Sequence, residues 1–292
     1  MNEHETVFLK TAIDEIFINE AGRYLDCTGG QGGHAAELLA RLGERGSLWI
    51  CDYHMDAVNH LKRKFQDNKQ VAVLHSRFSQ IFDNLNFPFD GIVADLGISS
   101  VQLADPSLGI GFLQDEAPLD MRLDSALLTS AADILKTYSE AALADIFFYY
   151  GGESASRKIA AAIVYDRHNN KFYETAGALR DLCARVLGRY YRHKKIHAAT
   201  KVFQALRIEV NQELEDLKVL LQKAPQFLNV DGRFAVISFH SGEDRLVKTC
   251  FKELAATPEF ELGKRKAIKP EPEEIARNPR SRSARMRVLK KI

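Results

Sequence analysis

The first third of the chain alternates between short apolar runs and longer segments in which apolar side chains recur every three or four positions. The short runs predict strands and the periodic segments predict amphipathic helices. This alternation is typical of an α/β protein built on a parallel sheet. The predicted strands are 24–27, 47–51, 71–75 and 89–95, and the predicted helices are 6–19, 35–42 and 56–65.

The middle of the chain has a different pattern, with helical periodicity and no clear strand. We interpret residues 107–202 as a helical insertion that divides one α/β domain into the segments 1–106 and 203–292. The helices predicted inside the insertion are 131–136, 139–149, 156–169 and 175–187.

The α/β alternation returns after the insertion, with a predicted helix over 199–221, a strand over 233–239 and a helix over 243–254. The last segment, 283–289, alternates as a strand does, and we expect it at an edge of the sheet. The pattern as a whole predicts a doubly wound sheet with a helical insertion domain.

Composition adds that this is an ordinary globular chain of 292 residues, with 46% hydrophobic and 27% charged residues. No apolar run is long enough to cross a bilayer, and the N-terminus lacks the pattern of a signal peptide. The 4 cysteines are scattered and form no C-x-x-C pair. We therefore expect a reduced cytoplasmic protein without membrane contact, structural zinc or another metal site.

A glycine-rich turn follows the first predicted strand, in the sequence DCTGGQGGH over 26–34. Glycine lets the backbone approach a ligand closely, and the amides at the start of the next helix are donors. Asp52 ends the next strand, at about the 20-residue spacing seen where a carboxylate binds the ribose of a nucleoside cofactor. Ala35 stands where a dinucleotide loop has its third glycine. Pyrophosphate and methionine sulfonium both remain open as ligands, as do a tight turn without a ligand and a helix-start role for His34.

Asp95 ends the predicted strand 89–95 and is followed by a small-residue turn and Gln102. A carboxylate and an amide in this arrangement suit the recognition of an exocyclic amine, although Asp95 could instead cap a turn. Asp26, Asp52 and Asp95 all fall at the carboxyl ends of predicted parallel strands. We expect them to converge on one cleft, because ligands of open α/β sheets bind there.

His240 follows the strand 233–239 and is adjacent in sequence to Ser241, Glu243 and Asp244. A hydrolase triad is disfavoured, because the chain has no G-x-S-x-G elbow. Ser241, Glu243 and Asp244 fit the first turn of a helix. His240 remains a candidate for the site.

The net charge is +1, but basic residues concentrate at 189–195 and 277–291 and are interleaved with tyrosines in the first of these segments. Such patches suit a polyanionic partner, and solvated charged segments are the alternative. The candidate contacts to such a partner are Arg189, Arg192, Lys194, Lys195, Arg280, Arg282 and Arg285.

Taken together, these segments resemble the bacterial family of small-subunit 16S ribosomal RNA (cytosine-N4)-methyltransferases. The resemblance extends over nearly the whole chain. It is carried by DCTGGQGGH (26–34), FDGIVADLGISSVQL (89–103), PLDMRLD (118–124), SRKIAAAI (156–163), HAATKVFQALRIEVNQEL (197–214), GRFAVISFHSGEDRLVK (232–248) and NPRSRSARMRV (278–288).

The resemblance implies a Rossmann-like class I methyltransferase sheet with a helical substrate-recognition insertion. It implies S-adenosyl-L-methionine as the cofactor and the N4 amine of a cytidine in 16S ribosomal RNA, in the decoding region of the small subunit, as the substrate. In the family pattern, Gly32, Gly33 and His34 lie against the methionine, Asp52 holds the ribose, Phe78 flanks the adenine, and Asp95 and Gln102 complete the cofactor contacts.

Asp95 is also the candidate catalytic acceptor for the amine, and the basic candidates become contacts to RNA. The sequence departs from the family pattern at His54, Val101, Gly152 and Gly242, which bears on substrate positioning and on the loop around residue 242. The rival functions are a DNA or small-molecule amine methyltransferase, a nicotinamide dehydrogenase and a non-catalytic ribosome-binding factor. Monomer and dimer both remain open.

Overall fold

The computed structural model describes residues 5–83, 85–99, 102–103, 105–124 and 126–292. The chain divides into two compact units, Met1–Gly97 with Glu215–Ile292 and, between them in sequence, Ile98–Leu214. The predicted insertion, 107–202, lies within the second unit, and its use in substrate recognition stays a prediction. Val101, one of the departures from the family pattern, lies outside the described residues.

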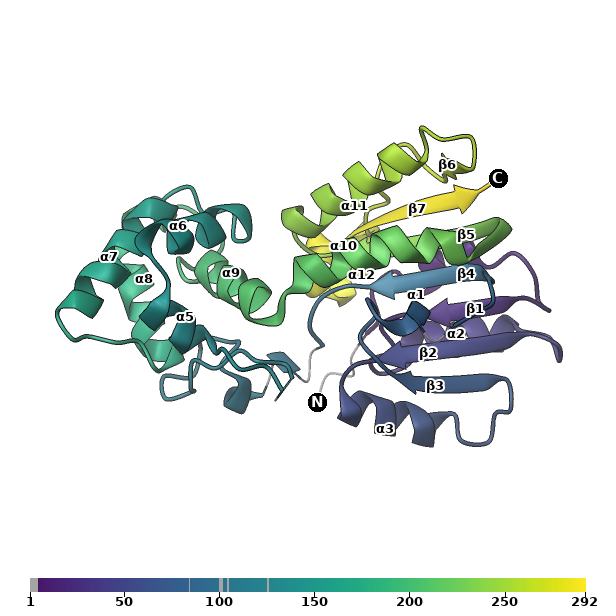
Figure 1. Ribbon diagram of the computed structural model, residues 1–292, viewed down its shortest axis with the longest axis horizontal. Coiled ribbons are helices and arrows are strands. Elements are labelled where there is room, and N and C mark those ends of the chain that lie inside the picture. The colour runs from purple at the N-terminus through teal and green to yellow at the C-terminus, as the bar shows by residue number, and fades with distance from the viewer. Residues whose placement is uncertain (1–4, 84, 100–101, 104, 125) are drawn as a thin grey trace. The chain divides into compact units, whose positions relative to one another are not determined.

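The described part of the first unit is built on a seven-stranded sheet in the order β3-β2-β1-β4-β5-β7-β6 (Figure 1). The first five strands of this order run parallel, whereas β7 is antiparallel to both of its neighbours. The predicted doubly wound sheet is thereby confirmed. The strands are β1 Arg23–Asp26, β2 Ser47–Asp52, β3 Val71–His75, β4 Phe89–Asp95, β5 Leu228–Ser238, β6 Phe260–Leu262 and β7 Arg285–Lys291.

The prediction that the last strand forms an edge of the sheet is wrong. β7 lies between β5 and β6, and β6 is the edge strand. β6 was not predicted, because a strand of three residues is too short to show an alternation of apolar and polar positions.

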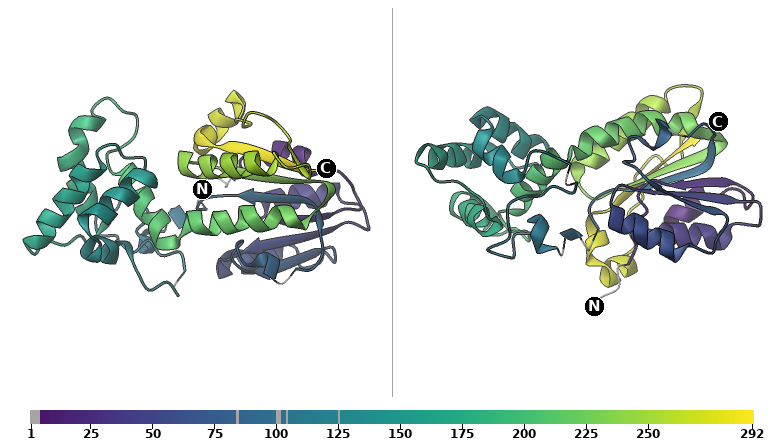
Figure 2. Two further views of the ribbon diagram at one scale, coloured as in Figure 1. Left: turned by 45° about the horizontal axis from the view of Figure 1, so that its top comes forward. Right: turned by 60° about the horizontal axis from the view of Figure 1, so that its bottom comes forward.

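Helices cover both faces of this sheet (Figures 1 and 2). On one face, α1 and α2 bury Ile13, Ile16 and Leu38 against strand residues that include Ile237. On the other face, Phe251 of α11 contacts Phe234 of β5, with ring centroids 5.5 Å apart. The helices of this part are α1 Leu9–Ile16, α2 Gly33–Arg41, α3 Met55–Lys64, α10 Glu213–Lys223, α11 Ser241–Leu254 and α12 Pro272–Arg277, with short 3-10 turns at Ile81–Asp83, Ala224–Phe227 and Pro279–Ser283.

The second unit is helical, as predicted. Ser130, Ser139 and Thr175 each begin a helix by accepting a backbone amide through the side-chain oxygen. Asn211 joins the loop before α5 to α9, since its amide group bonds the backbone of Met121 and Leu123. The helices are α5 Ala131–Thr137, α6 Glu140–Tyr149, α7 Ser156–His168, α8 Ala176–Tyr191 and α9 Thr200–Asn211, with a 3-10 turn at Pro106–Leu108.

The single helix predicted over 199–221 is wrong, because the chain breaks it into α9 and α10. Gln212 ends α9 with a φ of 55°, in the left-handed region. Residues other than glycine, asparagine and aspartate seldom adopt this conformation. Neither glycine nor proline marks this position. The helical periodicity therefore continued across a break that it could not reveal.

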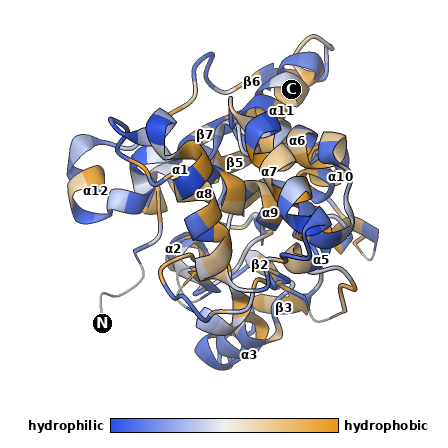
Figure 3. Ribbon diagram, turned by 90° about the vertical axis from the view of Figure 1, so that its left-hand side faces the viewer, coloured by the Kyte–Doolittle hydropathy of each residue, from blue (hydrophilic) through white to orange (hydrophobic). Residues whose placement is uncertain are grey.

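The helices of the first unit are amphipathic. In Figure 3 the ribbon of α3 changes between hydrophilic and hydrophobic residues along its turns, and its buried side chains are Val58 and Leu61. Such helices hold their apolar side chains against the sheet and leave the polar ones in water. Within the described residues, no helix combines the length and the apolar character that a bilayer span requires.

Candidate cofactor and active site

Three carboxylates stand at the carboxyl ends of the neighbouring strands β2, β1 and β4. Asp26 is 1% exposed, and burial raises its pKa to about 7, with a further contribution from the negative charge of Asp52. Burial also raises the pKa of Asp95 well above its usual value, and the charge of Asp26 adds to the rise. Because β2, β1 and β4 are neighbours in the sheet, the three residues lie at the same edge of it, and their convergence on one cleft stays a prediction.

The loop after β1 is pinned to both neighbouring strands by hydrogen bonds. The amide of Gly30 donates to Oδ2 of Asp52 at 2.8 Å, and the amide of Asp95 donates to the hydroxyl of Thr28 at 2.7 Å. The amide of Thr28 donates in turn to Oδ1 of Asp26 at 3.0 Å. Sequence reasoning did not single out Thr28, although a threonine directly before the glycines was a visible signal.

The glycines of this loop are required by space as well as by backbone conformation. A Cβ on Gly29 would lie 2.5 Å from a methyl of Ile50, and one on Gly33 would lie 1.9 Å from the hydroxyl of Thr6. Gly32 has a φ of 72° and precedes the first residue of α2. The result is a tightly packed strand-to-helix turn at the sheet edge, in which Gly29 and Gly32 are buried and the residues between them, like Gly33, are half-buried. Such a turn brings backbone amides to the start of α2, where a ligand can accept hydrogen bonds from them.

Asp95 carries the strongest sign of a ligand. The residue as a whole is half-buried, but its Oδ1 has no exposed surface and no hydrogen-bond partner among the described residues. Buried polar atoms are almost always hydrogen-bonded, because an unpaired one costs about 1–3 kcal/mol. A donor brought by a ligand, such as an amine, would satisfy this oxygen.

Asp52 is held in place by backbone amides and keeps capacity for a ligand. Its Oδ1 accepts the amide of His54 at 2.8 Å, and its Oδ2 accepts the amide of Gly30. A carboxylate has about four lone-pair positions, so a pair of ribose hydroxyls can still bind. Because His54 contributes its backbone amide here, its departure from the family pattern leaves the orientation of Asp52 intact.

His34 is buried on the first turn of α2, and its Nε2 lies 3.1 Å from the carbonyl oxygen of Val7. A carbonyl can only accept, so this contact assigns the proton to Nε2. The contact gives His34 a structural role in holding the N-terminal segment. Its predicted contact with the methionine of the cofactor stays a prediction.

Residues 5–8 form a strap along the glycine loop, and α12 holds the strap in place. The amide of Phe8 donates to Oε1 of Glu274 at 2.7 Å, and the side chain of Asn278 donates to the carbonyl of Glu5 at 2.9 Å. Thr6 of the strap is the residue that closes the space beside Gly33. Sequence reasoning missed this segment, because its contacts join residues that are distant in sequence.

The other two predicted cofactor residues, Phe78 and Gln102, belong to different units. Phe78 is half-buried in the turn after β3, and the amide of Ser76 in the same turn donates to the carbonyl of Asp52 at 3.0 Å. Gln102 belongs to the second unit, where its Oε1 accepts the amide of Ser99 at 2.7 Å. The contacts of both residues with a cofactor stay predictions.

His240 caps α11, and the surrounding residues form a helix start. Its Nδ1 accepts the amide of Glu243, and the carboxylate of Glu243 accepts the amide of Phe239 at 2.8 Å. The helix-start role predicted for Ser241, Glu243 and Asp244 is thereby confirmed. Gly242, a departure from the family pattern, lies in this first turn.

The basic candidates fall into two groups. Arg189, Arg192, Lys194 and Lys195 belong to the second unit and are exposed, and none has a carboxylate within 4.0 Å in the described parts of the chain. In the first unit Arg280 and Arg282 are exposed, whereas Arg285 is paired with Asp244 at 3.1 Å. Arg285 is thus the candidate for which the structure gives an ion pair as an alternative role.

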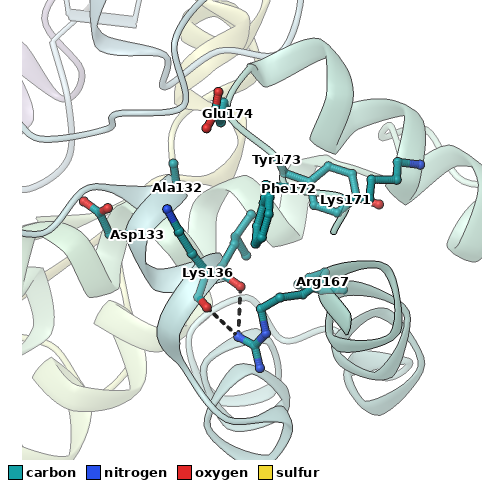
Figure 4. A pocket seen from close by; sticks show the side chains of 10 residues that line it. Ala132, Asp133, Lys136, Arg167, Lys171, Phe172, Tyr173 and Glu174 are labelled. Carbon is teal, nitrogen blue, oxygen red and sulfur yellow. Dashed lines mark hydrogen bonds between the residues drawn. The ribbon is translucent and has the colours of Figure 1, made fainter. Parts of the chain in front are cut away.

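A small pocket of about 70 Å³ opens in the second unit, lined by residues of α5, α7 and the segment 171–174 (Figure 4). Arg167 forms one side of the pocket. Its Nη1 donates to the carbonyls of Leu135, Lys136 and Tyr138, where α5 ends. These bonds satisfy carbonyls that the helix end leaves free. The pocket is too small for a nucleoside, and its arginine has a structural task.

Comparisons with known proteins show the family to which the chain belongs. The model of the MraW methylase family matches residues 1–292. Ribosomal RNA small subunit methyltransferase H of Clostridium botulinum (strain Loch Maree / Type A3) is 38% identical over 309 residues, covering 99% of both chains. The protein of the same name from Koribacter versatilis is 41% identical over 293 residues, covering 97% of this chain and 92% of its own.

Among solved structures, an rRNA methylase from Streptococcus thermophilus is similar at a TM-score of 0.42 and 10% identity, covering 98% of this chain and 92% of its own. The family match spans the whole chain, and the relatives are similar in length as well as in sequence. The chain therefore belongs to the MraW methylase family.

Proposed function

We propose that this protein transfers a methyl group from S-adenosyl-L-methionine to the N4 amine of a cytidine in 16S ribosomal RNA. The family and its relatives, which are named ribosomal RNA small subunit methyltransferases, support the reaction and the class of substrate. The observation that carries the proposal in the structure is the unpartnered, buried Oδ1 of Asp95, beside the glycine loop.

The residues at the sheet edge fit S-adenosyl-L-methionine, which supplies an electrophilic methyl group on a sulfonium. The glycine turn 29–33, which leads into α2, would lie against the methionine, and the free lone pairs of Asp52 would accept the ribose hydroxyls. Phe78 follows the strand next to β2 and flanks the adenine. The carboxylates also complement a positively charged ligand.

Asp95 acts on the substrate amine. The N4 lone pair of cytosine is delocalised into the ring, so the amine needs both alignment with the methyl carbon and an acceptor for its N–H. The N4 lone pair would form the new bond to the methyl carbon while the sulfur keeps the electrons of the broken bond, which leaves S-adenosylhomocysteine, and the N4 proton would pass to the carboxylate of Asp95 and then to water. A positive charge beside Asp95 lowers the pKa that burial has raised, and so keeps its oxygen available as an acceptor.

The second unit contributes to RNA binding through its exposed cations at 189–195, and the target cytidine leaves its stack to reach Asp95. The partner is the small ribosomal subunit or its RNA, in the cytoplasm. The free cysteines, of which Cys27, Cys51 and Cys183 are buried, are in keeping with a reducing compartment.

The test is methyl transfer from labelled S-adenosyl-L-methionine to small subunits or 16S RNA from a strain that lacks the gene, followed by mass spectrometry of the nucleosides. We expect N4-methylcytidine in RNA and none in matched DNA. Asp95→Ala should lower the rate on the order of 100-fold while the cofactor still binds. Cofactor binding without any methyl transfer by the wild type would favour a non-catalytic binding factor, and transfer at the wild-type rate by Asp95→Ala would exclude the role given to Asp95.

A further inference from the structure

The cations of the second unit fall into a paired and an unpaired group. The paired ones have carboxylate partners, as Arg180 has Asp115 at 2.5 Å and Arg185 has Asp166 at 2.8 Å. Throughout the described residues, the cations at the start of α7 and the end of α8 have no carboxylate within 4.0 Å. These are Arg157, Lys158, Arg189, Arg192, Lys194 and Lys195, and all are exposed.

Two of these unpaired cations meet on one neutral oxygen. Nζ of Lys158, on α7, and Nη2 of Arg189, on α8, both donate to the hydroxyl oxygen of Tyr190, the latter at 2.8 Å. Nζ of Lys158 lies 4.9 Å and Cζ of Arg189 lies 4.8 Å from the centre of the Tyr190 ring. Their hydrogen bonds also lower the pKa of Tyr190. Two positive charges held this close repel each other, and no neighbouring carboxylate offsets the repulsion.

The stability of the helices themselves does not account for this arrangement. A cation in the last turn of a helix, such as Arg189 in α8, interacts favourably with the helix dipole. Arg157 and Lys158, however, lie in the first turn of α7, where the dipole disfavours positive charge and where no acidic residue is present. Within the described residues, neither cation forms an ion pair that would offset this unfavourable interaction.

A buried carboxylate fixes the two helix ends against each other. Glu153 is fully buried, and it accepts the hydroxyl of Tyr191 at the end of α8. Its other oxygen accepts the amide of Ala155, just before α7, at 2.8 Å. The neighbours Lys158 and Tyr190 are therefore carried on a rigid junction, which favours a preformed binding site over a chance meeting of mobile side chains.

We propose that Lys158, Arg189 and Tyr190 form a clamp for a backbone phosphate of the RNA substrate, an inference that rests on the proposed function. Phosphate oxygens would accept from the ammonium, the guanidinium and the phenol, and the anion would offset the repulsion between the two cations. The remaining unpaired cations lie next to the clamp in sequence and extend the positive surface. Such a clamp reads no base, so it strengthens RNA binding without setting the sequence.

The test is the salt dependence of RNA binding by the full-length protein, using a labelled single-stranded fragment of 16S RNA. The slope of log K against log salt concentration is negative, and loss of one phosphate contact on a single strand should reduce its magnitude by about 0.7. We expect this decrease for Lys158→Gln and for Arg189→Gln, and a smaller loss of affinity for Tyr190→Phe, which keeps both cations.

Arg180→Gln is the matched control, because it removes the same charge from α8 but takes it from an existing ion pair. Its slope should stay within 0.2 of the wild-type value, on the same scale of about 0.7 per contact. Equal losses for Arg180→Gln and Lys158→Gln would overturn the clamp, since net charge alone would then explain the effect. Stronger loss of binding to polyglutamate or to phosphatidylserine vesicles than to RNA would also overturn it.

Methyl transfer at saturating RNA separates this inference from the proposed function. The clamp variants should keep the wild-type rate at saturation and require more RNA to reach it. A wild-type protein that transfers no methyl group to RNA contradicts the proposed function. Active variants whose RNA affinity and salt slope equal those of the wild type contradict the clamp alone.

Discussion

Asp26, beside the glycine loop, shows how a single residue can link the candidate cofactor site to the stability of the protein. Its carboxyl group is buried at the end of β1, near Asp52 and Asp95. Burial and neighbouring negative charge both favour the protonated form. The loop is therefore assembled around a carboxyl whose ionisation opposes folding.

The free energy of unfolding should consequently depend on pH through Asp26. The folded pKa is about 7, above the ordinary pKa of 3.8 for an aspartate side chain, so the folded state binds more protons between these values. Stability from this group is fully present below about pH 4 and is lost as the pH rises to about 7, by at most about 1.4 kcal/mol per pH unit. Asp26→Asn cannot ionise, and its side-chain oxygen can still accept the Thr28 amide. Urea unfolding from pH 5 to 8 should show a flatter decline for Asp26→Asn.

The control for this prediction is Asp67→Asn, at an exposed position away from the loop. Its pH profile should run parallel to that of the wild type. If the Asp26→Asn profile also runs parallel to the wild type, Asp26 does not titrate in this range.

Gly33 and Thr6 form a second residue-scale coupling, between the glycine loop and the strap 5–8. A methyl group on Gly33 would lie 1.9 Å from the hydroxyl of Thr6 and 2.9 Å from its Cβ. Gly33→Ala should therefore destabilise the protein by about 1–3 kcal/mol through overpacking. In a Thr6→Gly background the same change should cost less, because the obstructing side chain is gone. A double-mutant cycle measured by urea unfolding tests this, and additive effects would show that the strap yields freely.

At the scale of elements, local patterns carried much of the fold and contacts between distant residues decided the rest. Apolar periodicity predicted β3 at its observed bounds and α7 to within a residue, because both follow one local pattern throughout. It missed the break at Gln212, where only the tertiary structure selects a left-handed residue. It also placed β7 at the edge, since strand order depends on pairings that no single segment contains.

The candidate site divides in the same way. Asp52 and Asp95 were found because a polar residue that ends an apolar strand is visible in the sequence. Phe78 and Gln102 came only from the family resemblance, since aromatic and amide residues are common in cores and turns. The roles of Thr6 and Thr28 depend on contacts with Gly33 and Asp95, far away in the sequence, so no local pattern could show them.

Two glycines in the helical unit give a prediction at the element scale, in which one chemical change has opposite effects. Gly152 has a φ of 61°, between α6 and α7, whereas Gly188 lies inside α8 without a positive φ. A Cβ at either position would have no heavy atom within 4 Å beyond its chain neighbours and, at Gly188, the backbone of its own helix. Gly152→Ala should destabilise by about 1–2 kcal/mol, because an L-residue is strained in the left-handed region. Gly188→Ala should stabilise by up to about 1 kcal/mol through helix propensity.

Thermal or urea unfolding of the two single variants measures both effects, and each serves as the control of the other. The prediction also bears on the family pattern, which has glutamate where this chain has Gly152. Stabilisation by Gly152→Ala would show that the turn adopts another backbone conformation in solution.

At the scale of the whole molecule, the residues proposed for the two binding tasks belong to different units. The cofactor loop, Asp52 and Asp95 belong to the first unit, and the proposed phosphate clamp belongs to the second. The first unit is discontinuous in sequence, since the second is inserted between Gly97 and Glu215. Gln102 is a predicted cofactor residue that belongs to the second unit. Protection of its backbone on cofactor binding would therefore show that the cofactor affects the second unit.

Hydrogen exchange of the intact protein, measured with and without the cofactor, shows which segments of the two units the cofactor protects. A ligand at 100 times its Kd stabilises the folded state by about 2.7 kcal/mol, and local openings that break its contacts slow by a comparable factor. S-adenosyl-L-methionine should slow exchange at 29–34, 52–54, 76–79 and 95–97, and at 102–103 if Gln102 binds it. Adenosine alone should protect 52–54 and 76–79 and leave 29–34 unchanged, because it lacks the methionine. Protection confined to the segments that line the small pocket of the second unit would contradict the assignment of the cofactor to the glycine loop.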